Sequence, residues 1–253
     1  MVNQASNFIK EALQLIEVAK QRGIILRLMG ALAIRYHCQR FEVLYDTLGR
    51  EFSDIDFAGY GKQKSEIVKV LEESGYKMRM LSYSFVMSGR LIFTNEQSGR
   101  HVDVFLDKLD MCHRIDFKER LEVDYPTIPL AELLLEKMQI VRLGEKDVKD
   151  TIVLIRAHDI GDDDKDKINI SYIAKLLAKD WGFYYTVTTN LNKVKNLLSK
   201  NSQLSSEDKK DIATKIDAAL ERIDKEPKSL SWNLRAKMGP KKKWYKEVDT
   251  PKA

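Results

Sequence analysis

The stretch 52–57, which reads FSDIDF, constrains this chain more than any other. It alternates polar and apolar residues, and in a β-strand successive side chains point to opposite faces. The sequence therefore predicts a strand on which Asp54 and Asp56 share one face. Two carboxylates side by side repel each other, and a hard cation such as Mg²⁺ would remove that repulsion. A turn, or a solvated strand face without a ligand, is the alternative interpretation.

A second acidic strand is expected at residues 100–107. Val102, Val104 and Leu106 occupy alternate positions and face one way, so that Asp103 faces the other way. The sequence thus predicts a third carboxylate on a strand.

A strand-to-helix turn is expected at Gly30. Residues 24–29 form a short apolar run of strand length, and residues 31–37 have a helical pattern. Backbone N–H groups at a helix N-terminus can bind an anion, and glycine lets the backbone approach a phosphate closely. An ordinary tight turn with no ligand fits the same residues.

Apolar periodicity predicts most of the remaining structure. In the first half we expect a helix capped by Ser6 and ended by Gly23, a polar connection at 39–50, a helix from Ser65 to Gly75, and a hairpin over 83–94. The composition changes at Pro126. Beyond it, helices are predicted at 129–141, 146–155, 170–178, 191–198 and 206–223. The acidic run 162–166 lacks the glycine and closing glutamate of a calcium loop, and we interpret it as a solvated helix cap.

Two basic features of the second half have alternative explanations. Lys137 falls within the apolar stripe of its helix, so it either extends outward to solvent or points into a cleft toward an anion. The basic and aromatic segment 237–246 could bind a nucleic-acid backbone, but docking of Trp244 and Tyr245 on the helical half is favoured.

Composition narrows the class of protein. A hydrophobic content of 43% over 253 residues is sufficient for a substantial core. The net charge of +5 permits a nucleotide or nucleic-acid partner without requiring one. Cys38 and Cys112 match no metal or redox spacing, and the N-terminal segment is amphipathic rather than a signal peptide. We expect a cytoplasmic protein without a membrane partner.

The order of these motifs resembles the nucleotidyltransferase superfamily, whose members share the polymerase-beta-like fold. The resemblance covers about residues 24–157 and is carried by GALA at 30–33, by RxxSDxD at 50–56 and by Asp103 on a later strand. Within the superfamily, the chain is most similar to nucleotidyltransferases of the abortive-infection toxin type and to their uncharacterised relatives. The matching late motif is Lys146, Asp147 and Asp150, and Asp107 is a further acidic position.

The resemblance implies an α/β (α+β) fold, with a mixed-sheet catalytic core at 1–125 and a mostly helical domain at 126–253. It implies an enzyme that uses Mg²⁺ or Mn²⁺ to move a nucleoside monophosphate from a nucleoside triphosphate to a hydroxyl group on tRNA, a protein or a small molecule. The implied metal ligands and catalytic residues are Asp54, Asp56 and Asp103. The residues implied to contact the nucleotide are Gly30, Ala31, Arg50, Ser53 and Lys137.

One departure from the superfamily pattern leaves a second hypothesis open. The usual Gly-Ser after the first strand is Gly30-Ala31 here, so no serine hydroxyl is present at that position to contact a phosphate. The alternative is a catalytically weak module on the same fold that binds nucleotides or takes part in a toxin–antitoxin interaction.

Overall fold

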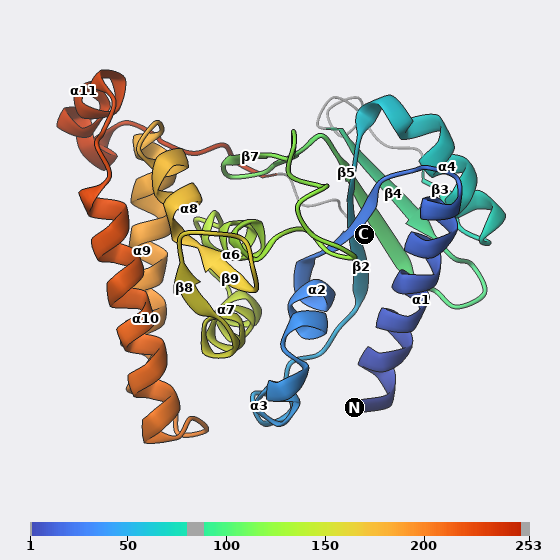
Figure 1. Cartoon of the computed structure of the whole chain (residues 1–253), viewed down its shortest axis with the longest axis horizontal. Helices are drawn as coiled ribbons and strands as arrows, with labels where there is room; N and C mark the ends of the chain where they lie inside the picture. The colour runs from blue at the N-terminus through green and yellow to red at the C-terminus, as the bar shows by residue number, and fades with distance from the viewer. Residues whose placement is uncertain (1, 80–88, 249–253) are drawn as a thin grey trace. The chain divides into compact units, whose positions relative to one another are not determined.

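The computed structural model describes residues 2–79 and 89–248 (Figure 1). The chain divides into two compact units. The first contains residues 1–42, 49–110 and 114–129, and the second contains residues 43–48, 111–113 and 130–253. The 83–88 part of the predicted hairpin lies outside the described residues.

A five-stranded mixed sheet forms the centre of the first unit. Its strand order is β1 (Leu26–Met29), β2 (Asp54–Gly59), β5 (His101–Leu106), β4 (Arg90–Thr94) and β3 (Lys77–Met78). Strands β2 and β5 are parallel, and the other neighbours are antiparallel. With the helices around it and a mostly helical second unit, this sheet confirms the predicted mixed α/β class.

Alternation along β2 and β5 decides which side of the sheet faces the core. Ile55 and Phe57 are buried, and they pair with Val102 and Val104 of the neighbouring strand. Because side chains alternate along a strand, the acidic residues between them are directed to the opposite face. The predicted strands therefore exist, with β5 ending one residue before Asp107.

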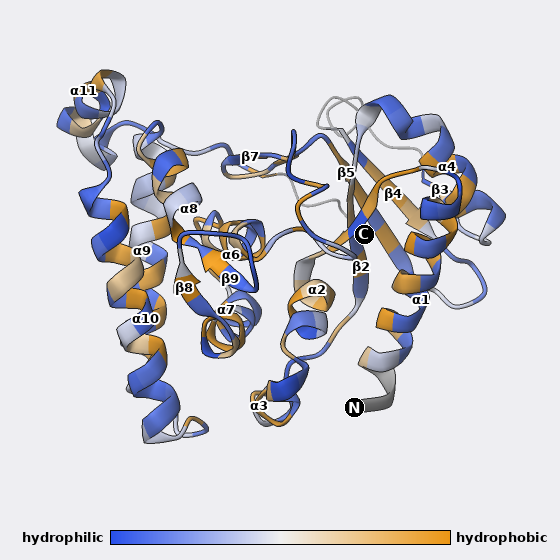
Figure 2. Ribbon diagram, viewed as in Figure 1, coloured by the Kyte–Doolittle hydropathy of each residue, from blue (hydrophilic) through white to orange (hydrophobic). Residues whose placement is uncertain are grey.

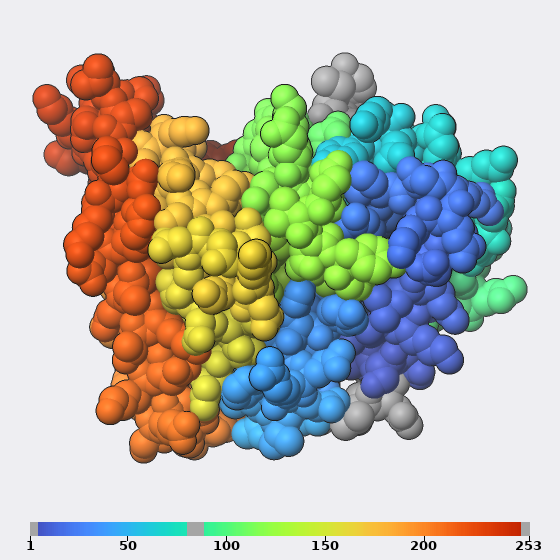
Figure 3. All heavy atoms as spheres, in the orientation of Figure 1, coloured from blue at the N-terminus to red at the C-terminus, as the bar shows by residue number. Residues whose placement is uncertain are grey.

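Helix α1 (Val2–Gln21) packs against β1, α2 (Gly30–His37) and α4 (Lys64–Glu73). The surfaces of α1 and α4 meet in Figure 3. The predicted cap at Ser6 is wrong, because the helix begins at Val2 and Ser6 lies inside it. The remaining elements of this unit are η2 (Gly61–Gln63) and the hairpin of β6 (Lys108–Asp110) and β7 (Arg114–Asp116).

The predicted polar connection at 39–50 is helical instead. It contains η1 (Gln39–Phe41) and α3 (Glu42–Thr47). Tyr45 and Leu48 are fully buried, so tertiary packing orders this segment. Its apolar pattern is short and interrupted by charged residues, and it therefore does not predict a helix.

The second unit is a set of packed helices. These are α6 (Leu130–Met138), α7 (Glu145–Ala157), α8 (Ile170–Leu177), α9 (Trp181–Leu198), α10 (Ser206–Lys225), α11 (Leu230–Met238) and η3 (Gly239–Lys241). Helix α10 packs along α7, α8 and α9, and α6 contacts the same three helices. In Figure 2 the hydrophobic residues of α10 are interspersed with hydrophilic ones, as in an amphipathic helix with buried Ile212, Ile216 and Ile223.

The acidic run 162–166 connects two short parallel strands, β8 (Asp159–Gly161) and β9 (Lys167–Asn169). The prediction that this run caps α8 is wrong. Asn169 does so, because its side chain accepts a hydrogen bond from the Tyr172 N–H. Among the described residues, no helix is both long enough and apolar enough to cross a bilayer.

Candidate functional site

The carboxylates of Asp54 and Asp56 lie on one face of β2. The strand begins at Asp54, and Ile55 between the two is fully buried while Asp54 is exposed and Asp56 is half-buried. This alternation excludes the turn interpretation of the motif. The hydroxyl of Ser53 donates a hydrogen bond of 2.9 Å to Asp54 Oδ2, which orients that carboxylate.

Asp103 lies beside this pair on the adjacent strand. In the parallel register of β2 and β5, Asp103 pairs with Asp56, and His101 pairs with Asp54. Paired residues of neighbouring strands direct their side chains to the same face. Burial raises the pKa of Asp103, Arg90 opposes that rise, and the charge of Asp54 adds to it. The structure thus brings together the three predicted carboxylates, which come from two strands.

The turn at Gly30 lies directly against Asp56. Met29, the last residue of β1, pairs with Asp56, and α2 begins at the next residue. Gly30 has φ +71°, and a Cβ added to it would lie 2.4 Å from Asp56 Oδ2. Met29 provides no side-chain cap to α2. The N-terminus of α2, with Ala31 as its second residue, therefore adjoins the acidic face of the sheet.

Arg90 is a site residue that the sequence analysis missed. It lies at the start of β4, and its Nη2 forms an ion pair with Asp103 Oδ2. The guanidinium also lies over the Phe105 ring, 5.3 Å from the ring centre. In the sequence, Arg90 falls within the hairpin predicted at 83–94, with nothing to link it to the acidic residues. Its partner is 13 positions away and depends on the pairing of β4 with β5.

The acidic face provides the oxygen donors that Mg²⁺ prefers. Asp54 and Asp56 fit an ion that keeps several waters and binds substrate phosphates. However, no group of three His, Cys, Asp or Glu side chains within 2–79 and 89–248 is arranged to hold a metal. Asp103, the third carboxylate of the face, is paired with Arg90. Metal ligation by Asp103 remains a prediction that requires its release from Arg90.

Arg50 precedes the Asp pair in a half-buried position. Its guanidinium donates to the Glu51 carbonyl and lies 5.2 Å from the centre of the Phe52 ring. Contact of Arg50 and Ser53 with a nucleotide remains a prediction. Asp107, the further acidic position, instead accepts a 2.9 Å hydrogen bond from the Gly61 N–H.

Lys137 belongs to the second unit and is only 9% exposed. Its Nζ lies 3.2 Å from Asp150 Oδ2, 3.8 Å from Glu136 Oε1 and 3.9 Å from Asp147 Oδ1. Of the two alternatives, outward extension to solvent does not occur, because the lysine meets anions of its own unit. Contact of Lys137 with a nucleotide phosphate remains a prediction.

The late acidic pair has two different local roles in this unit. Asp150 is fully buried on α7, so favourable interaction with the helix dipole does not suffice to explain it. Asp147 lies at the third position of α7 and accepts from the Gly144 N–H, which caps the helix. Lys146 is exposed.

The chain is distantly similar in structure to solved structures of a known protein. No protein-family model and no curated protein sequence matches the chain. The solution structure of the antibiotic-resistance factor ANT(2'')-Ia is similar at 12% identity and a TM-score of 0.41, over 70% of this chain and 95% of that one. The crystal structure of ANT(2'')-Ia in complex with adenylyl-2''-tobramycin is similar at 13% identity and a TM-score of 0.39, over 60% and 87% of the two chains.

Proposed function

We propose that this protein is a metal-dependent nucleotidyltransferase that moves a nucleoside monophosphate from a nucleoside triphosphate to a hydroxyl acceptor. The observation that carries the proposal is the position of Asp54 and Asp56 on one strand face, beside the N-terminus of α2 and next to Asp103. This arrangement sets oxygen donors for a cation beside backbone donors for a phosphate. It matches the motif order that resembles the superfamily.

Each site residue has a defined part in the proposed transfer. Asp54 and Asp56 would hold Mg²⁺ or Mn²⁺, which when bound neutralises phosphate charge and orients the triphosphate. The backbone N–H groups at Gly30 and Ala31 would bind phosphate oxygens without the missing serine hydroxyl. Negative charge builds on the leaving pyrophosphate during the transfer, and the positive charge of Arg50 would stabilise it.

Proton transfer is assigned to Asp103. The acceptor hydroxyl would give its proton to this carboxylate, its oxygen would bond to the α-phosphorus, and the bond from that phosphorus to pyrophosphate would break. The ion pair with Arg90 favours the ionised form that a base requires, against the effect of burial on the Asp103 pKa.

The test is a transfer assay with separated acceptors. The protein is incubated with Mg²⁺ and each of the four α-labelled nucleoside triphosphates, together with total tRNA, an aminoglycoside mixture or no added acceptor. We expect label in one acceptor class, and no label with the Asp56→Ala variant. Asp116→Ala, which removes an exposed strand carboxylate of the same unit, is the matched control and should retain activity. Transfer that survives Asp56→Ala would reject the proposal.

Two observations favour a second candidate function, a nucleotide-binding or toxin–antitoxin interaction module with little turnover. Ala31 provides no hydroxyl, and Asp103 is bound to Arg90. Nucleotide binding that depends on Asp56, without transfer to any acceptor, would support this candidate over the first.

A further inference from the structure

The acidic face of the first unit already contains one cation of the protein itself. Three carboxylates share the face, and the guanidinium of Arg90 is paired with one of them, Asp103. Arg90 reaches it from β4, the strand on the far side of β5 from β2. The positive charge is therefore placed on the β5 side of the face.

Packing holds this ion pair in place. The side chains of Arg90 and Asp103 are only 18% and 14% exposed. The arginine also rests on the Phe105 ring, whose residue pairs with Arg90 across the two strands. A mostly buried pair with a second, aromatic contact is more strongly fixed than an exposed ion pair, whose side chains lose entropy when they meet.

The β2 side of the face is different. Asp54 is exposed and accepts its hydrogen bond from the neutral Ser53 hydroxyl, which supplies no positive charge. A divalent ion at Asp54 and Asp56 would have oxygen ligands from one strand, and the exposure of Asp54 leaves that carboxylate accessible to waters and phosphates. The two sides of the face are thus suited to two different cations.

We propose that Arg90 takes the place of one of the two metal ions in the proposed reaction, so that the site binds a single divalent ion at Asp54 and Asp56. This inference rests on the proposed function and deepens it. In two-metal sites the ions lie about 3.5–4 Å apart and clamp the attacking and leaving oxygens. Here the guanidinium supplies fixed positive charge at Asp103, on the side where the acceptor hydroxyl would lie.

The test counts bound metal and does not depend on turnover. Free Mn²⁺ is measured by electron paramagnetic resonance during titration of the full chain, with a saturating α,β-methylene analogue of each nucleoside triphosphate. A titration without protein subtracts the Mn²⁺ held by the analogue alone. We expect about one protein-dependent Mn²⁺ per chain, and two would overturn the inference.

Variants of the ion pair sharpen the test. Arg90→Met keeps an apolar stem on Phe105 but removes the charge, and it should raise the count from about one to about two. Arg90→Lys should leave the count at one. Asp103→Asn should not change the count in the natural protein, but it should remove the additional ion from Arg90→Met. An unchanged count in Arg90→Met would overturn the inference.

Arg100→Met is the matched control. Arg100 lies in the same unit, pairs with Glu11 and rests on the Phe8 ring, so its removal should leave the count at one.

Asp56→Asn separates the two proposals. If the natural protein binds two ions and Asp56→Asn abolishes that binding, the inference fails while the proposed function stands. If Mn²⁺ binding is absent or unaffected by Asp56→Asn, the proposed function itself fails and the inference with it.

Discussion

Gly30 combines two constraints that make it irreplaceable in this turn. Its φ of +71° lies in the left-handed region, where a side chain costs of order 1 kcal/mol or more. The Asp56 carboxylate also occupies the space that a Cβ would need. A substitution here would therefore strain the backbone and displace a proposed metal ligand.

We predict that Gly30→Ala lowers Mn²⁺ affinity at least tenfold and destabilises the first unit by about 1–3 kcal/mol. Gly23→Ala is the matched control, because Gly23 has φ +72° but no atom within 4 Å of an added Cβ. It should lose similar backbone stability and retain Mn²⁺ binding. Titration with Mn²⁺ and urea unfolding followed by circular dichroism measure both effects. Equal Mn²⁺ affinities in the two variants would contradict the steric argument.

At the residue scale, predictability depends on whether a contact is local. The shared face of Asp54 and Asp56 follows from the period of two along a strand, so the sequence predicts it. The ion pair of Arg90 with Asp103 depends on the register of two strands, which no local pattern specifies. This explains why three acidic residues of the site were predicted but the cation beside them was not.

At the scale of elements, Lys137 and Asp150 join α6 to α7. The lysine is 9% exposed and the carboxylate is fully buried. Removing one member of a buried pair leaves a charge that water does not reach, which typically costs about 3–5 kcal/mol. The pair thus has a structural explanation independent of any nucleotide.

We predict that Lys137→Met destabilises the second unit by about 3 kcal/mol, and that Lys137→Met with Asp150→Leu recovers much of the loss. Urea unfolding followed by tryptophan fluorescence is the measurement, because all three tryptophans lie in the second unit. If Lys137 instead contacts a phosphate, Lys137→Met should weaken nucleotide binding with little change in stability.

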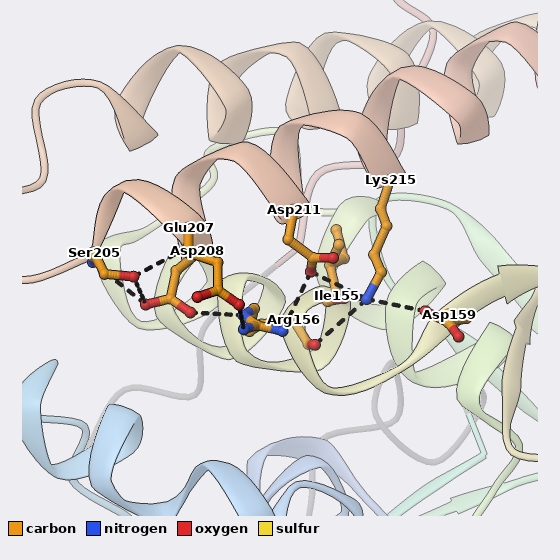
Figure 4. A network of polar contacts seen from close by, with 8 residues as sticks. All are labelled: Ile155, Arg156, Asp159, Ser205, Glu207, Asp208, Asp211 and Lys215. Atoms are coloured by element: carbon orange, nitrogen blue, oxygen red, sulfur yellow. Dashed lines mark hydrogen bonds and ion pairs between the residues drawn. The ribbon is translucent and has the colours of Figure 1, made fainter.

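A second charge network joins the C-terminal end of α7 to α10 (Figure 4). Arg156 donates to Asp208 at 2.6 Å and lies 3.4 Å from Glu207 and 3.6 Å from Asp211. Lys215 bridges Asp211 and Asp159 at 3.1 and 3.2 Å. The carboxylates of Glu207 and Asp208 also lie in the first turn of α10, where the helix dipole favours them.

We predict that Arg156→Lys destabilises the second unit nearly as much as Arg156→Met, by about 1–2 kcal/mol. The reason is that a guanidinium donates in several fixed directions, whereas an ammonium acts as a single point charge. Lys195→Met, which removes an exposed pair with Asp217, is the control and should cost less than about 1 kcal/mol. Full stability in Arg156→Lys would show that charge alone, and not the fork geometry, holds the network.

Element predictions depended on how much of a helix carries apolar periodicity. The spacing along α10 predicts most of that helix, whereas α9 was predicted only at 191–198 although it begins at Trp181. By contrast, α3 has six residues and is ordered by burial of Tyr45. Its existence depends on contacts that a local pattern does not contain.

At the scale of the whole molecule, the two units are not consecutive in the chain. The short segments 43–48 and 111–113 interrupt the first unit and belong to the second. The predicted division at 125 and 126 follows a change in composition, and composition cannot assign segments of three to six residues to a unit. That assignment comes from individual side chains, of which His113 is an example.

His113 is buried among residues of the second unit. Its ring stacks on Phe183 with centroids 4.9 Å apart, and its Nε2 lies 2.8 Å from Thr186 Oγ1. The His113 N–H of the main chain donates to Gln139 Oε1 at 3.0 Å. Burial lowers the pKa of His113 to about 4 from an ordinary value of 6.5, and the charge of Asp180 opposes this only in part.

The lowered pKa makes the second unit sensitive to acid. Above pH 6.5 the imidazole is neutral in both folded and unfolded chains, so its stabilising environment is fully retained. Between pH 6.5 and 4 the unfolded chain binds a proton that the folded chain excludes. The free energy of unfolding therefore decreases as the pH is lowered, by up to about 1.4 kcal/mol per pH unit. Other carboxylates add their own pH dependence, which a difference between variants removes.

We predict that His113→Gln, which keeps a polar group near Thr186 but cannot titrate, loses less stability than the natural protein between pH 6.5 and 4.5. Tryptophan fluorescence in urea at several pH values measures the unfolding free energy of this unit. The two curves should lie parallel above pH 7 and converge as the pH falls, because only the natural protein gains a proton on unfolding. Parallel curves over the whole range would show that the imidazole is accessible to protons in the folded state, and that residues 111–113 are less firmly held than their contacts indicate.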